Sequence, residues 1–296
     1  MKKFKFNCIS GLPRAGSTLL ANLLNMPENH HVTTTSATLD VLKVMRSNFS
    51  HDITWKAQNR LELYENFRNG MKGFIDGYFS DKEIVFDKNR GWPNNLKLLD
   101  EILGNTDSKI IWCYRDVVEI IGSIESGYQK TLLIESIDEQ GAPGAFATLD
   151  RRIGTFIGDG GIVTFPVEAL IDAIEMGYGD RIMIVKYYDL TNNTQATLDL
   201  IHDFIGEPRV QYDLTKLKQS THEYDGFYNY KFLHTIKEGA VEYKKSNIEL
   251  PEKYVEIINN KFAPLNRLVF DGLPDMLLNT TEEALMNNRR ISIKLK

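Results

Sequence analysis

Short apolar runs along the chain alternate with segments whose apolar residues recur every three or four positions. The apolar and β-branched runs predict strands at residues 4–10, 30–36, 83–87, within 109–116 and at 181–188. The three- and four-residue spacing predicts helices between these runs, including an amphipathic helix from about 58 to 78. Strands separated by helices of this length form βαβ units, so the pattern predicts an α/β fold with a central, mainly parallel sheet flanked by helices.

The chain shows no internal repeat and no linker, so we expect one domain over residues 1–296. The periodic pattern weakens between about 127 and 165, where glycines are frequent, and predicts loop insertions with space for one short helix. A helical tail is predicted from about 251 to 296, with its clearest periodicity up to residue 268.

Composition restricts the possible partners and locations. The 35 Lys and Arg residues against 40 Asp and Glu give a net charge of −5, so no overall positive field attracts nucleic acid or an anionic membrane, and any anion site must be local. No apolar window is long enough to span a membrane, and the amino terminus alternates like a strand rather than a signal peptide, so a cytoplasmic location without a membrane partner is expected. Cys8 and Cys113 lie in apolar runs and are predicted to be buried free thiols.

A glycine-bounded loop connects the first predicted strand to a helix. It consists of Gly11, Leu12, Pro13, Arg14, Ala15, Gly16, Ser17 and Thr18. Backbone N–H groups in such a loop bind an anion together with the helix amino terminus, and hydroxyl side chains add donors. The lysine of a nucleotide P-loop is replaced here by Ser17, and Arg14 is the nearby cation, so the loop suits a triphosphate poorly.

The pattern G-x-P-R-x-G-[ST]-T of this loop resembles the 5′-phosphosulfate loop of the sulfotransferases, particularly their bacterial and Golgi-type branches. Arg115 and Ser123 are similar in spacing to the family's arginine and serine that hold the 3′-phosphate of 3′-phosphoadenosine 5′-phosphosulfate (PAPS), although Val117 stands where the family has proline. Weaker matches follow in the family's order at residues 86–92, 186–190, 204–206 and 237–239, so that the resemblance covers about 4 to 270.

The resemblance implies a three-layer fold like that of the P-loop NTPases, and transfer of a sulfuryl group from PAPS to a hydroxyl or amine acceptor. The product from the donor would be 3′,5′-adenosine bisphosphate (PAP), and no metal is expected. The acceptor is expected to be a small molecule, a carbohydrate or a peptide, selected by the 127–165 insertions and the aromatic stretch 224–230. The resemblance assigns these residues to the donor: Gly11, Pro13, Arg14, Ala15, Gly16, Ser17, Thr18, Arg115, Ser123, Lys237 and Gly239.

Sulfuryl transfer needs positive groups at the bridging and leaving oxygens and a base for the acceptor's proton. Arg14 and Lys88 are predicted to provide the positive charge. In Golgi-type relatives the base is a glutamate at the position where this chain has Thr35, and cytosolic relatives use a histidine that residues 88–90 lack. Three substitutes have equal standing on sequence grounds, namely His31, Asp40 and Asp87.

Two other functions remain open from the residues alone. In a P-loop kinase, the run ending in Asp87 would be the strand whose aspartate organises Mg²⁺ around ATP, but the missing loop lysine argues against this alternative. In a nucleotide-binding protein without catalysis, Arg14, Arg115 and Ser123 would bind PAP while the base has been lost.

Overall fold

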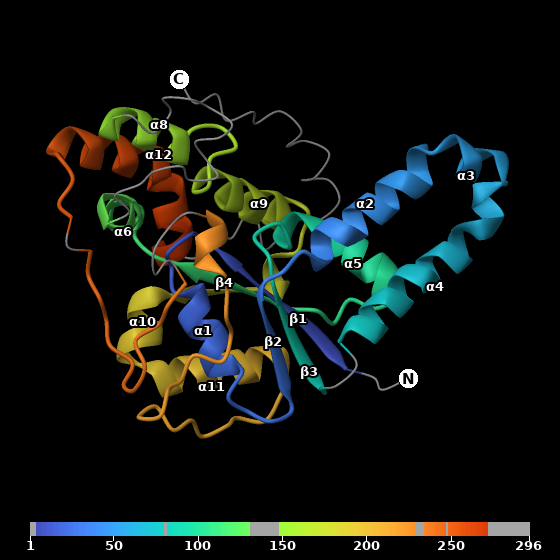
Figure 1. Cartoon of the computed structure of the whole chain (residues 1–296), viewed down its shortest axis with the longest axis horizontal. Helices are drawn as coiled ribbons and strands as arrows, with labels where there is room; N and C mark the ends of the chain where they lie inside the picture. The colour runs from blue at the N-terminus through green and yellow to red at the C-terminus, as the bar shows by residue number, and fades with distance from the viewer. Residues whose placement is uncertain (1–3, 80–81, 131–147, 229–233, 247, 272–296) are drawn as a thin grey trace.

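A five-stranded parallel sheet forms the centre of the molecule (Figure 1). The computed structural model describes residues 4–79, 82–130, 148–228, 234–246 and 248–271. The strand order is β2-β3-β1-β4-β5, with bounds Lys5–Gly11 (β1), His30–Thr35 (β2), Ile84–Lys88 (β3), Ile110–Tyr114 (β4) and Ile182–Lys186 (β5). The predicted α/β fold with a central parallel sheet is confirmed.

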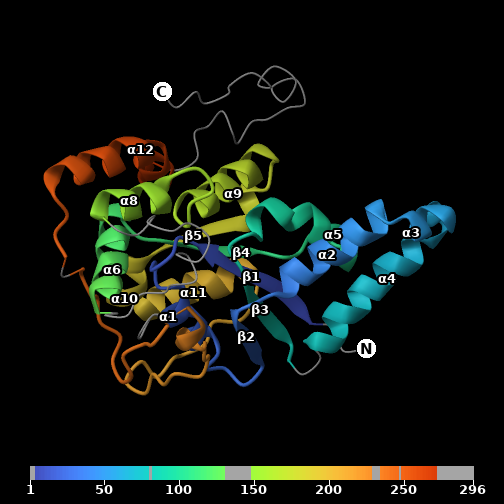
Figure 2. The same cartoon turned by 45° about the horizontal axis from the view of Figure 1, so that its top comes forward.

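Helices cover both faces of the sheet, which gives three layers. Helices α1 and α11 lie on one face, and α5 and α9 lie on the other (Figures 1 and 2). The helices outside the arm described below are α1 (Ser17–Leu24), α5 (Leu96–Leu103), α6 (Val117–Lys130), α8 (Leu149–Ile157), α9 (Thr164–Glu175), α10 (Tyr187–Asn192), α11 (Thr194–Ile205) and α12 (Glu252–Asp271). Single 3₁₀ turns occur at Pro93–Asn95, Gly179–Arg181 and Asp225–Tyr228. None of the described helices is long and apolar enough to cross a membrane.

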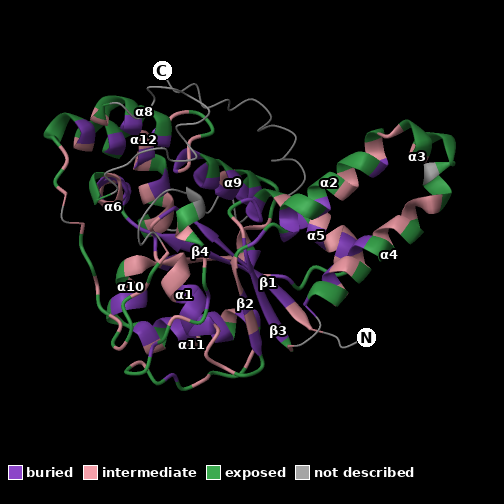
Figure 3. Ribbon diagram, in the orientation of Figure 1, coloured by how far each residue is buried: buried purple, intermediate pink, exposed green. Residues whose placement is uncertain are grey.

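Three helices form an arm that projects from the body: α2 (Thr38–His51), α3 (Ile53–Ala57) and α4 (Arg60–Tyr78). The rings of Phe49 and Phe67 stack with centroids 4.1 Å apart and hold α2 against α4. Much of the arm is exposed to solvent (Figure 3), whereas Leu39 and Leu42 of α2 and Met71 and Ile75 of α4 are buried in the core. The arm is therefore joined to the core through these four side chains.

The core lies between the sheet and its helices. Strands β3 and β4 are buried along their whole length, as expected for strands covered on both faces. Cys8 and Cys113 are completely buried and form no disulfide, which confirms the prediction made for them.

The strand register brings the carboxyl ends of neighbouring strands to one edge of the sheet. Thr35 pairs with Lys88, Lys88 pairs with Ile9, and Gly11 pairs with Cys113. Ligands of open parallel sheets bind at this edge. The glycine loop leaves from the same edge, so any site that uses it lies here.

Some predicted boundaries differ from the structure. The last strand ends at Lys186 rather than 188, because Tyr187 starts α10 and turns its ring onto Gly16. Helix α6 continues to Lys130, and α8 is the short helix expected within 127–165. Residues 131–147 of that insertion and 272–296 of the predicted tail lie outside the described residues.

Gly11 is required by the close approach of β1 to β4. Its φ of +123° is a conformation that side chains disfavour, and a Cβ there would lie 2.3 Å from the Cys113 carbonyl oxygen. We expect Gly11→Ala to destabilise the fold by about 3 kcal/mol or more in urea unfolding, since the strained backbone alone costs about 1–3 kcal/mol. The control is Gly70→Ala in α4, where the added methyl meets no atom within 4 Å and should stabilise the protein by about 0.5–1 kcal/mol. Equal effects of the two substitutions would contradict this account.

Candidate active site

The glycine loop has the backbone of an anion cradle. Gly11, Arg14 and Gly16 all have positive φ, at 123°, 58° and 88°, and α1 begins directly after the loop at Ser17. Such a turn directs successive N–H groups into one concavity, which the helix amino terminus makes more positive. A Cβ at Gly16 would lie 2.7 Å from the Tyr187 ring, so this position needs glycine. The local sequence therefore builds a site for a phosphate or sulfate group.

Arg14 of the glycine loop contacts Ser123, the residue that the resemblance pairs with Arg115. The Nε of Arg14 donates a hydrogen bond to the Ser123 hydroxyl at 3.2 Å, although 109 residues separate them. Ser123 lies two turns into α6, whose first turn is capped by Asp116 through a hydrogen bond from the Glu119 N–H. Helix α6 thus brings a hydroxyl to the side of the loop.

Arg115 connects the loop to three other parts of the chain. Its guanidinium donates to the Arg14 carbonyl at 3.3 Å, to the Lys244 carbonyl at 2.8 Å and to the Glu119 carboxylate at 2.9 Å. It also lies over the Tyr187 ring, with its central carbon 4.6 Å from the ring centroid. The side chain is buried, and these contacts hold it rigidly at the end of β4.

The two arginines place positive charge at the loop, offset in part by Glu119 beside Arg115 and by Asp225 near Arg14. Burial lowers the pKa of Arg14, and the charge of Arg115 lowers it further. Two guanidinium groups held this close repel each other, and a bound anion with several oxygens would relieve the repulsion. The arrangement favours a ligand with more than one acidic group.

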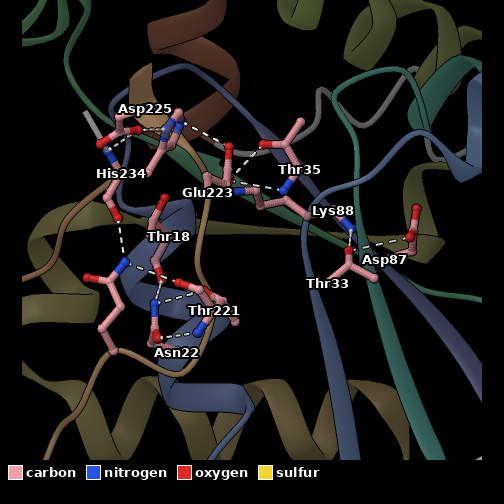
Figure 4. Close-up of polar contacts among 11 residues, drawn as sticks. Thr18, Asn22, Thr33, Thr35, Asp87, Lys88, Thr221, Glu223, Asp225 and His234 are labelled. Atoms are coloured by element: carbon pink, nitrogen blue, oxygen red, sulfur yellow. Dashed lines mark hydrogen bonds and ion pairs between the residues drawn. The ribbon is translucent and has the colours of Figure 1, made fainter. Parts of the chain in front are cut away.

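A second charged cluster surrounds Lys88 at the end of β3 (Figure 4). The Lys88 ammonium lies 2.7 Å from Oε1 of Glu223. The same Oε1 accepts hydrogen bonds from the Thr35 N–H at 3.0 Å and the Thr35 hydroxyl at 2.9 Å. Oε2 of Glu223 is buried, has no hydrogen-bond partner among the described residues and lies 3.4 Å from Nε2 of His234. Nδ1 of His234 lies 2.7 Å from Asp225.

The charges of this cluster shift one another's protonation. Burial lowers the pKa of Lys88, while Glu223 opposes the shift. Burial raises the pKa of Glu223, but the attraction of Lys88 and its hydrogen bond outweigh that effect, so the net pKa lies below the usual value. Burial also lowers the pKa of His234, against the attraction of Glu223 and Asp225. Glu223 is therefore an ionised carboxylate at neutral pH.

Asn22 in helix α1 positions the segment that carries Glu223. Its buried side-chain oxygen accepts hydrogen bonds from the N–H groups of Ser220 and Thr221, at 2.6 and 3.0 Å. Its nitrogen donates to the Thr221 hydroxyl and to the Thr18 carbonyl of the glycine loop's last residue. Residues 218–224 belong to no helix or strand, so these side-chain bonds replace the backbone ladder of a regular element.

Three sequence-predicted base candidates lie in different surroundings. His31 is at the amino end of β2, paired in register with Val85, on the opposite edge of the sheet from the glycine loop. Asp87 is completely buried and accepts from the Trp92 indole at 2.8 Å, and burial raises its pKa. Asp40 is exposed and lies 3.4 Å from the Asn89 amide. Asp87 lies next to Lys88 in β3 and shares Thr33 with the Lys88 N–H, whereas Asp40 is linked to Asn89 and His31 lies at the other end of β2.

Three further predicted residues are Lys88, Lys237 and Gly239. Lys88 lies at the same sheet edge as the glycine loop. Lys237 pairs with Glu242 in solvent, with 71% of its side chain exposed, and Gly239 forms an isolated antiparallel bridge with Leu217. The contact that this part of the chain makes with Arg115 comes from the Lys244 carbonyl instead.

Sequence reasoning missed Glu223, Asp225 and His234. The stretch 222–232 is rich in aromatic residues, and those residues drew the interpretation toward acceptor stacking. The available signal was two carboxylates within three residues, followed by a histidine nine residues after the second. Residues 229–232 of the stretch lie outside the described part of the chain.

No group of three side chains that could hold a metal ion occurs among the residues that the structure describes. The positive charge at the sheet edge comes from Arg14, Lys88 and Arg115, together with the N–H groups of the loop. These groups suit an anionic ligand that binds through its oxygens.

Comparison with known proteins identifies similar sequences and folds. A family model described as "Sulfotransferase domain" matches residues 7–245. The sulfotransferase domain from the curacin biosynthetic pathway is 14% identical, with 89% of this chain and 98% of that chain covered and a TM-score of 0.57, which shows a shared fold. A sulfotransferase from Alicyclobacillus acidocaldarius is 12% identical, with 96% and 99% covered and a TM-score of 0.49. No curated protein matches the chain significantly.

The role of Asn22 can be tested by its removal. We expect Asn22→Ala to release the segment 219–228, because the N–H groups of Ser220 and Thr221 lose their acceptor, and each such bond contributes about 0.5–1.5 kcal/mol. Amide hydrogen exchange should show faster exchange in this segment and unchanged exchange in β1 and β4. Asn192→Ala, which removes an exposed amide in α10, should leave the segment protected. Unchanged protection in Asn22→Ala would mean that other contacts position Glu223.

Proposed function

The chain belongs to the sulfotransferase family, and we propose that it transfers the sulfuryl group of PAPS, bound at the glycine loop, to an acceptor hydroxyl or amine. The family model covers well over half of the chain and supports sulfuryl transfer as the reaction. PAPS is the donor that sulfotransferases generally use. We propose PAPS as the donor of this protein, together with the residues that contact it and the class of acceptor.

The observation that carries the proposal is the convergence of Arg14, Arg115 and Ser123 on the glycine loop. PAPS has an anionic group at each end of its ribose, a phosphosulfate on the 5′ side and a phosphate on the 3′ side. The loop N–H groups with Ser17 and Thr18 suit the first, and Arg115 with Ser123 suits the second. A site with two separate anion-binding elements fits this donor better than a mononucleotide.

In the proposed reaction the acceptor oxygen attacks the sulfur in line with the bond to the 5′-phosphate. The new O–S bond forms, the old S–O bond breaks, and its electron pair goes to the phosphate oxygen of PAP. Arg14 and Lys88 stabilise the negative charge that develops on the bridging and sulfuryl oxygens. The acceptor's proton requires a base.

The kinase alternative has no support from the site. Asp87 would have to hold Mg²⁺, but it is completely buried and its Oδ2 accepts a hydrogen bond from Trp92. The loop also lacks the lysine that a triphosphate requires.

Lys237 and Gly239 stay in the proposal as residues that border the 3′-phosphate, although the Lys237 ammonium pairs with Glu242 in this structure.

Thermal shift tests the donor. We expect PAP without magnesium to raise the melting temperature by about 5 °C or more, since ligand at 100 times its Kd adds about 2.7 kcal/mol to stability. ATP with magnesium should raise it far less, because the loop has no lysine for the γ-phosphate. The opposite ranking would count against PAPS.

A turnover assay separates an enzyme from a protein that only binds the nucleotide. PAPS is incubated with a panel of phenols, primary alcohols, sugars and amines, and the release of PAP is measured.

Substitution of Arg115 tests the 3′-phosphate site. Arg115→Ala should weaken PAP roughly 10- to 100-fold by calorimetry, since hydrogen bonds to charged groups contribute about 1.5–3 kcal/mol. Adenosine 5′-phosphate, which lacks the 3′-phosphate, should lose much less affinity in the same variant. Arg209→Ala is the control, because that arginine pairs with Asp203 in solvent. Equal losses for both nucleotides would place the 3′-phosphate elsewhere.

A further inference from the structure

The place where Golgi-type relatives carry their catalytic glutamate holds Thr35 in this chain, and a threonine cannot take the acceptor's proton. The structure nevertheless has a carboxylate there. Glu223, 188 residues further along, places Oε1 within 3.0 Å of both the N–H and the hydroxyl of Thr35. The carboxylate also lies against Lys88 at the carboxyl edge of the sheet (Figure 4).

We infer that Glu223 is the general base of the reaction and that its Oε2 takes the proton of the acceptor. This inference rests on the proposed function, since it names the residue that completes the proposed sulfuryl transfer. Asp225 and His234 act in the inference as positioning residues, and Asn22 anchors the segment that carries the carboxylate.

The two oxygens of Glu223 have different surroundings, which identifies the reactive one. Oε1 accepts from Lys88 and twice from Thr35, so its lone pairs are occupied. Oε2 is buried and receives no hydrogen bond from the described residues. A buried carboxylate oxygen without a donor is unfavourable. Because Oε2 is buried and faces His234 in the structure without ligands, an acceptor hydroxyl reaches it only when the residues that cover it move aside, and the hydroxyl then supplies the missing donor.

His234 gives the carboxylate a polar partner on its other side. Nε2 of His234 lies 3.4 Å from Oε2, and Asp225 holds the opposite ring nitrogen at 2.7 Å. Asp225 fixes the orientation of the imidazole in the same way as the aspartate of a catalytic triad. Once Oε2 has accepted the proton, the imidazole is close enough to share it, and the two flanking carboxylates stabilise the resulting charge.

Lys88 links the base to the sulfuryl group. Its ammonium pairs with Glu223 in the absence of ligand, and the strand register places it beside Ile9, two residues before the glycine loop. In the reaction the proton moves from the acceptor oxygen to Glu223, the acceptor oxygen forms its bond to sulfur, and PAP departs with the electron pair of the broken bond. Lys88 then lies beside a carboxylate that has been neutralised, and the sulfur has exchanged its bond to the PAP oxygen for a bond to the acceptor oxygen.

The test compares Glu223→Gln with wild type in PAPS turnover and PAP binding. Glutamine keeps the shape and an acceptor oxygen for Lys88 and Thr35 but cannot accept a proton. We expect kcat to fall about 10²- to 10⁴-fold, the usual contribution of a general base, while the Kd of PAP changes less than about threefold. Glu249→Gln is the matched control, since that glutamate is exposed in the same irregular region and should leave both quantities unchanged.

Acceptor acidity gives a readout that a structural defect would not change. Among the hydroxyl acceptors of the panel that wild type uses, the rate loss in Glu223→Gln should be largest for aliphatic alcohols and smallest for acidic phenols, which are already ionised. His234→Asn should lower kcat with little change in the acceptor KM.

The outcomes separate the two proposals. Glu223→Gln with turnover within fivefold of wild type, or with an equal loss for all acceptors, would overturn the assignment of the base and leave the proposed function intact. Loss of PAP binding in Glu223→Gln would also overturn it, since the residue would then serve the donor site. Wild type that binds PAP but transfers sulfuryl to no acceptor would overturn the proposed reaction, and the inference with it.

Discussion

The close contact between the glycine loop and strand β4 determines the position of the whole site. Gly11 lies against the backbone of Cys113 at a distance that excludes a side chain, and the Leu12 N–H donates to the Cys113 carbonyl at 2.9 Å. Two residues after Cys113 comes Arg115, whose guanidinium reaches the Arg14 carbonyl at the far side of the loop. The distance between the loop and the arginine that closes it is therefore set by strand packing, which is among the most rigid parts of a fold.

The other half of the site depends on side chains rather than on strands. The described residues between 217 and 246, which leave out 229–233, contain little regular structure, yet they contribute the Lys244 carbonyl to Arg115 and the Glu223 carboxylate to Lys88. Asn22 fastens it to the helix that follows the glycine loop. An irregular segment retains one conformation only when its polar groups find partners, and here those partners are Asn22, Lys88 and Arg115. The same side chains, Asn22, Lys88 and Arg115, therefore hold the irregular segment against the residues around the glycine loop.

The sequence predicted the features that depend on local patterns of apolar and polar residues. Apolar runs and helical spacing located the strands and the main helices, because burial on both faces of a parallel sheet leaves a clear periodic signal. Arg14 and Arg115 stand out in the sequence because they follow strands, and Ser123 is assigned through the resemblance to the sulfotransferases, whose arginine and serine have the same spacing. Tyr187 was placed in a strand, since its aromatic ring suits one, but the space above Gly16 determines its helical position. Glu223 could not be found in this way, because its role arises from contacts between residues 135 and 188 positions apart in an aperiodic stretch.

The separation of the donor loop from Glu223 along the chain also has an evolutionary consequence. The groups proposed to bind PAPS up to residue 123 are built into the sheet and its first helices, whereas the carboxylate proposed as base belongs to a segment that follows the last strand. Changes near Glu223 can replace this carboxylate without altering the glycine loop, whereas Lys244 of the same segment holds Arg115 through its carbonyl. A replacement of the stretch around Glu223 therefore has to keep both the fit to the Asn22 amide and the Lys244 carbonyl.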